Sequence, residues 1–213
     1  MSNLKKHVWF MRHGKINFDY ENCAYDELME MLSNGSKKPL LNRHGIKFTF
    51  LPPNVELVCH SPEKRASDTA AKLKEKLEVG SVEEIDLLRE VKFDKDIIEK
   101  EKYTSLEDSR PFILKRWFYN ENKSESFKAS TARVARIEKF LQNRQERSII
   151  LVTHGWFLRL LKLYFVNGKR NGIDLEDLLN VKPIALGQFF EATLEPERST
   201  RSIIYTASAL SAK

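Results

Sequence analysis

The sequence predicts an α/β fold, a three-layer α/β/α sandwich built on a mainly parallel sheet. Two observations lead to this prediction. Short apolar runs alternate along the chain with amphipathic segments, the order expected when parallel strands are joined by crossover helices. The last run, Gly187 to Leu194, instead alternates apolar and polar residues and predicts an antiparallel strand near the C-terminus.

Length and composition favour a single globular domain. A chain of 213 residues suits one full-sized domain and is short for two, so we expect one domain over residues 1–213. The net charge of +6 suits an anionic small substrate, and equally weak contact with nucleic acid or a membrane surface. Two cysteines are too few for a disulfide framework. No run is long enough to span a bilayer and no signal peptide is evident, so we expect a cytoplasmic protein.

Strands are expected where short apolar runs are bounded by glycine, proline or polar residues. The predicted strands cover residues 8–11, 55–59, 82–87, 148–152 and 187–194, with a further edge strand at 202–205. The first four are separated by helical segments and should therefore be parallel. Their carboxyl ends should meet at one edge of the sheet, where α/β proteins bind ligands.

Helices are expected where apolar residues recur every three to four positions. The predicted helices cover residues 26–32, 43–50, 62–80, 111–119, 124–142 and 156–166. Ser61 should cap the third helix, with Pro62 as its first residue. The fifth carries basic residues away from its apolar side, at Arg133, Arg136, Lys139 and Arg144. We interpret them as a solvated face rather than a nucleic-acid site, because no aromatic platform or groove-reading motif accompanies them.

Polar residues suited to anion chemistry follow each of the first four strands. They are Arg12-His13-Gly14, then His60-Ser61 with Arg65, then Glu90, then His154-Gly155. Arginine offers a planar fork of donors for phosphate or carboxylate, and imidazole can act as nucleophile, base or acid near neutral pH. No metal-ligand spacing accompanies them. The sequence therefore predicts an active site for an anionic substrate at the sheet edge.

These motifs resemble the histidine phosphatase superfamily, also called phosphoglycerate mutase-like. The matching segments are Met-Arg-His-Gly at 11–14, His-Ser-Pro-x-x-Arg-Ala-x-x-Thr-Ala at 60–70, Leu-x-Glu at 88–90 and Thr-His-Gly at 153–155. Their order and spacing agree with the family from Val8 to about Phe190. The resemblance implies a metal-independent, cofactor-free phosphatase acting on a phosphomonoester or a phosphohistidine.

The resemblance also implies a role for each residue. His13 would be the nucleophile that forms a phosphohistidine, and Glu90 the acid that protonates the leaving oxygen. His154 would donate a hydrogen bond to a phosphoryl oxygen. The phosphate-binding residues would be Arg12, Arg65, Asn17 and Gly155. The expected partner is a small phosphorylated substrate or a phosphoprotein, with no role for nucleic acid or a membrane; oligomeric state is left open.

The chain departs from the family pattern in two places. Ile16 stands where Ser or Thr is common, and we expect Asn17 to compensate. Phe93 to Asp96 replaces a Gly-x-Trp-Glu-Gly segment found in phosphoglycerate mutases, which argues against mutase activity. We expect an insertion at about 91–120 to select the substrate. Its candidate contacts are Arg110, Arg116, Trp117 and Tyr119.

Three alternatives remain open. A phosphate-binding regulatory module could keep the pocket and lack turnover. Cys59 lies six positions before Arg65, the spacing of a cysteine-dependent phosphatase loop, although Pro62 lacks an N–H and the segment has no glycine. Nucleic-acid binding through the positive charge would show steep salt dependence.

Overall fold

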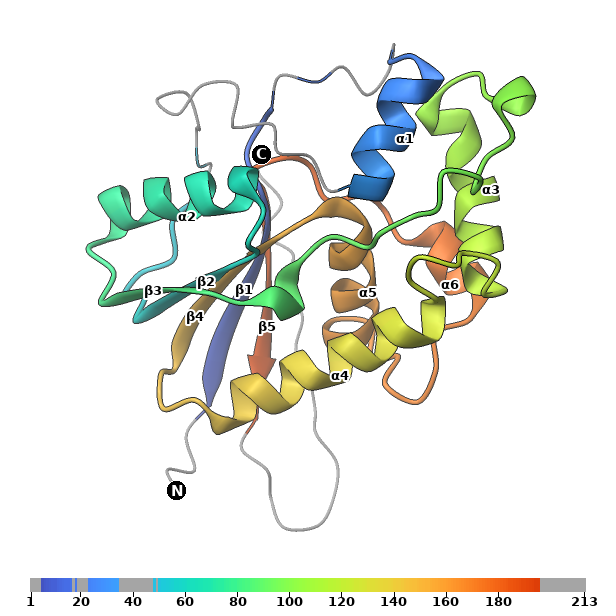
Figure 1. The fold of residues 1–213 in the computed structure, drawn as a ribbon. Helices are drawn as coiled ribbons and strands as arrows, with labels where there is room; N and C mark the ends of the chain where they lie inside the picture. Colours follow the sequence, from blue (N-terminus) through green and yellow to red (C-terminus); the bar gives the residue numbers. More distant parts are fainter. Residues whose placement is uncertain (1–4, 17, 19–22, 35–47, 49, 196–213) are drawn as a thin grey trace.

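A computed structural model describes residues 5–16, 18, 23–34, 48 and 50–195 of the protein, and within them five strands form one sheet (Figure 1). The strands are β1 (Lys6–Arg12), β2 (Leu57–His60), β3 (Ser81–Glu84), β4 (Ser148–Thr153) and β5 (Phe189–Leu194). Their order is β3-β2-β4-β1-β5. β1 to β4 are parallel, and β5 is antiparallel to β1. The predicted mainly parallel sheet with a C-terminal antiparallel strand is confirmed.

Helices cover both faces of this sheet, which confirms the three-layer sandwich. They are α1 (Tyr25–Asn34), α2 (Lys64–Leu77), α3 (Leu106–Phe118), α4 (Phe127–Asn143), α5 (Gly155–Phe165) and α6 (Leu175–Asn180). α2 lies on one side of the sheet, with α4 and α5 on the other (Figure 1). Alternate residues of β1 serve the two layers: Trp9 and Met11 belong to the core under α2, whereas Val8 and Phe10 belong to the larger core under α4 and α5.

The start of α2 and the end of β3 differ from the prediction. α2 begins at Lys64, two residues later than expected, and Glu63 rather than Ser61 is its N-cap residue. β3 stops at Glu84 instead of continuing to residue 87. β2 ends at His60, whose carbonyl accepts the Ile85 N–H at 2.8 Å. The residues that follow Ile85 therefore have no neighbouring strand to pair with. It turns instead into a 3₁₀ helix at Asp86–Leu88.

α3 and α6 differ from the prediction, and the residues that cap their first turns explain why. α3 begins at Leu106, five residues before Pro111, because the Ser105 hydroxyl accepts the Asp108 N–H and caps the first turn. α6 was not predicted, although Asp174 and Asp177 form a capping box at its start. Most of the predicted helix at 43–50 and the whole predicted strand at 202–205 lie outside the described residues. No helix of the described part is long and apolar enough to cross a membrane.

Candidate active site

The parallel strands bring the predicted site residues to one edge of the sheet. Arg12 is in register with Thr153 on β4, and His60 on β2 with Val152. The backbone of His13 continues this pattern, since its N–H donates to the Thr153 carbonyl at 3.0 Å. The rings of His13 and His154 consequently lie 5.1 Å apart, centroid to centroid. The two strand-end histidines thus share one site, as the topology predicted.

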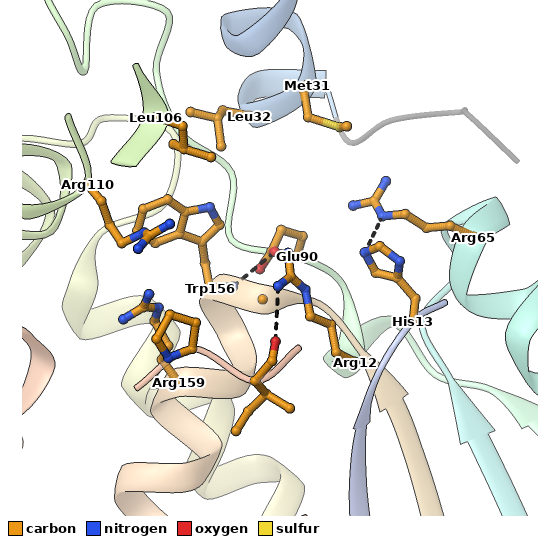
Figure 2. A pocket seen from close by; sticks show the side chains of 13 residues that line it. Arg12, His13, Met31, Leu32, Arg65, Glu90, Leu106, Arg110, Trp156 and Arg159 are labelled. Atoms are coloured by element: carbon orange, nitrogen blue, oxygen red, sulfur yellow. Dashed lines mark hydrogen bonds between the residues drawn. The ribbon is translucent and has the colours of Figure 1, made fainter. Parts of the chain in front are cut away.

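A pocket of about 630 Å³, including its open mouth, lies above this edge (Figure 2). Its lining combines predicted site residues with apolar and basic ones: Arg12, His13, Met31, Leu32, Arg65, Glu90, Leu106, Arg110, Gly155, Trp156, Arg159, Pro183 and Ile184. Among the described residues, no group of three or more His, Cys, Asp or Glu could hold a metal ion.

The partners of His13 define its tautomer. Its Nδ1 lies 2.8 Å from the Gly14 carbonyl oxygen, which can only accept, so Nδ1 carries the proton. Its Nε2 accepts a hydrogen bond from Arg65 Nε at 3.1 Å, so this nitrogen bears the lone pair. Burial, reinforced by the charges of Arg65 and Arg12, holds the pKa of His13 well below its ordinary value. The imidazole is therefore neutral near pH 7, with Nε2 free of a proton as a nucleophile requires.

His154 shares Arg65 with His13. The same Arg65 Nε lies 3.1 Å from His154 Nδ1, which accepts from it, while His154 Nε2 lies 2.7 Å from the Ser61 hydroxyl. The His154 side chain is fully buried, and burial together with Arg65 lowers its pKa well below the ordinary value. One guanidinium N–H is thus shared by two neutral imidazoles.

The two predicted phosphate-binding arginines are fixed in different ways. Arg12 donates from NH1 to the Ile184 carbonyl at 3.0 Å. It crosses directly over Gly155, where a Cβ would lie only 3.1 Å from Arg12 Cζ, so glycine gives this guanidinium its room. Arg65 forms an ion pair with Glu63, 2.5 Å between NH2 and Oε2. Both guanidinium groups reach the pocket beside His13.

The Glu90 side chain lies in the pocket next to the first turn of α5. Its carboxylate accepts the N–H groups of Trp156 at 3.1 Å, Phe157 at 2.9 Å and Val91 at 3.0 Å. Burial nevertheless raises the pKa of this carboxyl above its ordinary value, with the nearby Glu63 adding to the shift. A raised pKa favours the protonated form that a general acid needs.

Sequence reasoning missed Glu63 and Thr69, although both lie inside the 60–70 motif. Glu63 Oε1 accepts the Glu90 N–H at 3.0 Å, so Glu63 links Arg65 to the backbone of Glu90. The Thr69 hydroxyl accepts the Gly14 N–H at 3.0 Å and donates to the Arg65 carbonyl at 2.7 Å. Their positions inside the 60–70 motif were the signal from which the sequence could have identified Glu63 and Thr69 as site residues. Thr69 therefore ties the first strand end to α2, whereas Glu63 ties the start of α2 to the segment that carries Glu90.

The prediction that Arg133 belongs to a solvated face is wrong, whereas Arg136 and Lys139 are exposed as expected. Arg133 is 1% exposed and donates from NH2 to Glu125 Oε1 at 2.7 Å. Its NH1 donates to the carbonyls of Leu87 at 3.1 Å and Arg89 at 2.5 Å, directly before Glu90. This buried pair holds the segment that carries Glu90.

The expected selectors in 91–120 are not all placed around the pocket. Arg110 lines it. Trp117 is fully buried in the core, where its ring packs edge-on against Phe93. Arg116 pairs with Glu121 at 2.8 Å outside the pocket lining, and Tyr119 is 57% exposed. Only Arg110, of these four, is positioned to meet a ligand in this pocket.

The remaining sequence predictions concern Ile16, Asn17 and Cys59. Ile16 is buried against Met31 and Phe18 and offers no polar contact. Asn17 lies outside the described residues. Cys59 is buried in β2, and burial raises the pKa of its thiol to about 12, so it is not a thiolate at neutral pH.

Comparisons with known proteins bear on the fold and on the family of the chain. No curated protein matches the chain by sequence. A mycobacterial glucosyl-3-phosphoglycerate phosphatase of known structure is 15% identical, covers 89% of this chain and 91% of its own, and gives a TM-score of 0.63. A phosphoserine phosphatase variant from Entamoeba histolytica, solved with phosphoserine, is 14% identical over 95% of both chains, with a TM-score of 0.61. At these identities the likeness shows a shared fold. The sequence model of the histidine phosphatase superfamily (branch 1) matches residues 8–182, and the protein therefore belongs to that superfamily.

Proposed function

We propose that the protein is a phosphatase that hydrolyses a phosphomonoester, or a phosphohistidine, through a covalent phosphohistidine on His13 and without a metal ion. One observation carries the proposal. The Gly14 carbonyl fixes the proton of His13 on Nδ1, and the Nε2 lone pair faces Arg65 at the floor of a pocket lined by a second arginine. A neutral, oriented imidazole beside two guanidinium groups is suited to attack on a phosphoryl group.

In the first step, the phosphoryl oxygens bind Arg12 and Arg65 and replace His13 as acceptor of the Arg65 Nε–H. The freed Nε2 attacks phosphorus while the bond from phosphorus to the leaving oxygen breaks. Glu90 gives its proton to that oxygen, which leaves as an alcohol. The phosphoryl dianion favours transfer of a proton from solvent to His154 Nδ1, which then donates to a phosphoryl oxygen where charge accumulates.

In the second step, the Glu90 carboxylate takes a proton from a water molecule as that water attacks phosphorus. The bond between phosphorus and His13 Nε2 breaks, its electron pair returns to the nitrogen, and inorganic phosphate leaves. Glu90 is protonated again for the next cycle. The positive charge that the reaction needs comes from Arg12 and Arg65 rather than from a metal ion.

The comparisons support a phosphatase, since the similar solved structures include a glucosyl-3-phosphoglycerate phosphatase and a phosphoserine phosphatase. The cysteine-dependent alternative has no support from the buried Cys59 thiol. A phosphate-binding module without turnover is the competing function. It would keep the same pocket, so activity measurements separate the two.

The test is hydrolysis of p-nitrophenyl phosphate in buffer containing EDTA by the parent, His13→Ala and His7→Ala proteins. His7 is an exposed histidine on the same strand and serves as the matched control. We expect turnover in the parent and the control, none in His13→Ala, and an acid-labile, base-stable phosphoryl group on His13 by mass spectrometry after rapid quenching. Full activity of His13→Ala would overturn the mechanism. A parent that binds inorganic phosphate without turnover would establish the binding module.

A further inference from the structure

The end of the pocket away from His13 carries two additional arginines. Arg110 comes from α3 and Arg159 from α5, and both line the same pocket as Arg12 and Arg65. Figure 2 shows their guanidinium groups near one another, across Glu90 and Arg12 from His13. The phosphoryl chemistry proposed above uses Arg12 and Arg65 and leaves this second pair without a role.

Arg159 is a buried cation that forms no ion pair within the described part of the chain, where Glu107 and Glu90 are its nearest opposing charges. Arg159 is only 5% exposed, and its NH1 donates to the Val181 carbonyl at 3.0 Å. Among the described residues, no carboxylate lies within 4 Å of its guanidinium nitrogens. Burial, with repulsion from Arg110 and Arg12, lowers the pKa of Arg159 to about 10. A buried charge is costly unless it is paired, so an anion at this point relieves an existing penalty.

Arg110 is available to the same anion. It pairs with Glu107 three residues earlier on α3, at 2.7 Å from NH1 to Oε1. The Glu107 side chain is 75% exposed, and an exposed pair of this kind contributes little free energy. The Arg110 guanidinium can therefore give up its ion pair with Glu107 and bind a ligand at a small cost in free energy.

We propose that Arg110 and Arg159 bind a second acidic group of the substrate, a carboxylate or a second phosphate, at the far end of the pocket from His13. The inference rests on the proposed phosphatase function and narrows its substrate to a small molecule with two separated acidic groups. Two guanidinium forks match the oxygens of either group. Leu32 and Leu106 also line the pocket, so a short uncharged linker joins the two acidic ends.

The test compares three esters of one chain length: propyl phosphate, 3-carboxypropyl phosphate and propane-1,3-diyl bisphosphate. We expect kcat/KM for one acidic ester to exceed that for propyl phosphate about tenfold to a hundredfold, as charge-assisted hydrogen bonds predict. Preference for the carboxylate or the bisphosphate identifies which acidic group binds. Equal kcat/KM for all three esters would overturn the inference.

The variants Arg159→Met and Arg110→Gln assign the preference to these residues. Each should reduce the ratio of kcat/KM for the acidic over the neutral ester to near one, mainly through KM, whereas Arg136→Gln, an exposed arginine on α4, should keep the ratio. Arg110→Gln decides the matter if Arg159→Met does not fold. A ratio unchanged in Arg110→Gln would contradict the proposal. Failure of the phosphatase function is distinct, because none of the esters would then be hydrolysed in a reaction that needs His13.

Discussion

Replacing Arg133 with methionine tests how much the buried pair with Glu125 contributes to the free energy of unfolding. Arg133 is 1% exposed and donates to Glu125 from both Nε, at 3.1 Å, and NH2, at 2.7 Å. Its guanidinium also stacks on the Phe157 ring, 3.8 Å from the centroid. Methionine is unbranched and fills part of the vacated space, so the main consequence is a buried Glu125 that has lost one of its two arginine partners.

Removing one partner of a buried ion pair costs about 3–5 kcal/mol of folding free energy. Glu125 keeps hydrogen bonds from Arg89 NH1 at 2.7 Å and the Ser130 hydroxyl at 2.8 Å, so we expect the lower end of that range. For a chain of this size, a loss of about 3 kcal/mol should lower the melting temperature by about 6–12 °C. Arg136→Met, on the exposed side of the same helix, should change stability by no more than about 0.5 kcal/mol.

Urea denaturation followed by circular dichroism measures both variants and the double variant Arg133→Met/Glu125→Gln. The double variant should be more stable than Arg133→Met alone, because glutamine removes a buried charge that keeps only one of its two arginine partners. A loss below about 1 kcal/mol in Arg133→Met, on the scale of an exposed pair, would refute the reasoning. So would a double variant that is no more stable than the single one.

Three further predictions concern the pocket. Glu90→Gln should slow hydrolysis of propyl phosphate about a hundredfold or more, and p-nitrophenyl phosphate much less, since nitrophenolate leaves without a proton; parallel assays on the two esters check this. Gly155→Ala puts a Cβ 3.1 Å from Arg12 Cζ and should reduce kcat/KM about tenfold, while the melting temperature reports any loss of fold. His13 and His154 are held neutral in the folded state, so below about pH 6.5 the unfolded chain binds more protons. Stability should be full above that pH and decline as the pH falls, and the urea midpoint of His13→Ala should decline less steeply.

The sequence predicted the parts of this protein that depend on local pattern. Buried strands are continuous apolar runs, and parallel topology alone brings residues that follow β1, β2 and β4 to one edge. The burial of Arg133 could not be predicted from the sequence. Helical periodicity separates apolar from polar positions, but it does not show that Glu125 neutralises one of the cations in the core. The extent of β3 depended on where its neighbour β2 ends, which is information outside its own segment.

Two neutral histidines share Arg65 Nε, the donor that the proposed mechanism assigns to the substrate. Arg65 Nε lies 3.1 Å from both His13 Nε2 and His154 Nδ1, and neither imidazole can carry a proton on those nitrogens while accepting from it. This arrangement agrees with the lowered pKa values of both histidines, since the nearby guanidinium opposes protonation. A phosphoryl oxygen is a stronger acceptor than an imidazole nitrogen, so in the proposed mechanism it displaces both histidines from Arg65. In the proposed mechanism, binding of the anion uncovers the His13 Nε2 lone pair that attacks phosphorus, and it also favours a proton on His154 at the step that needs a donor.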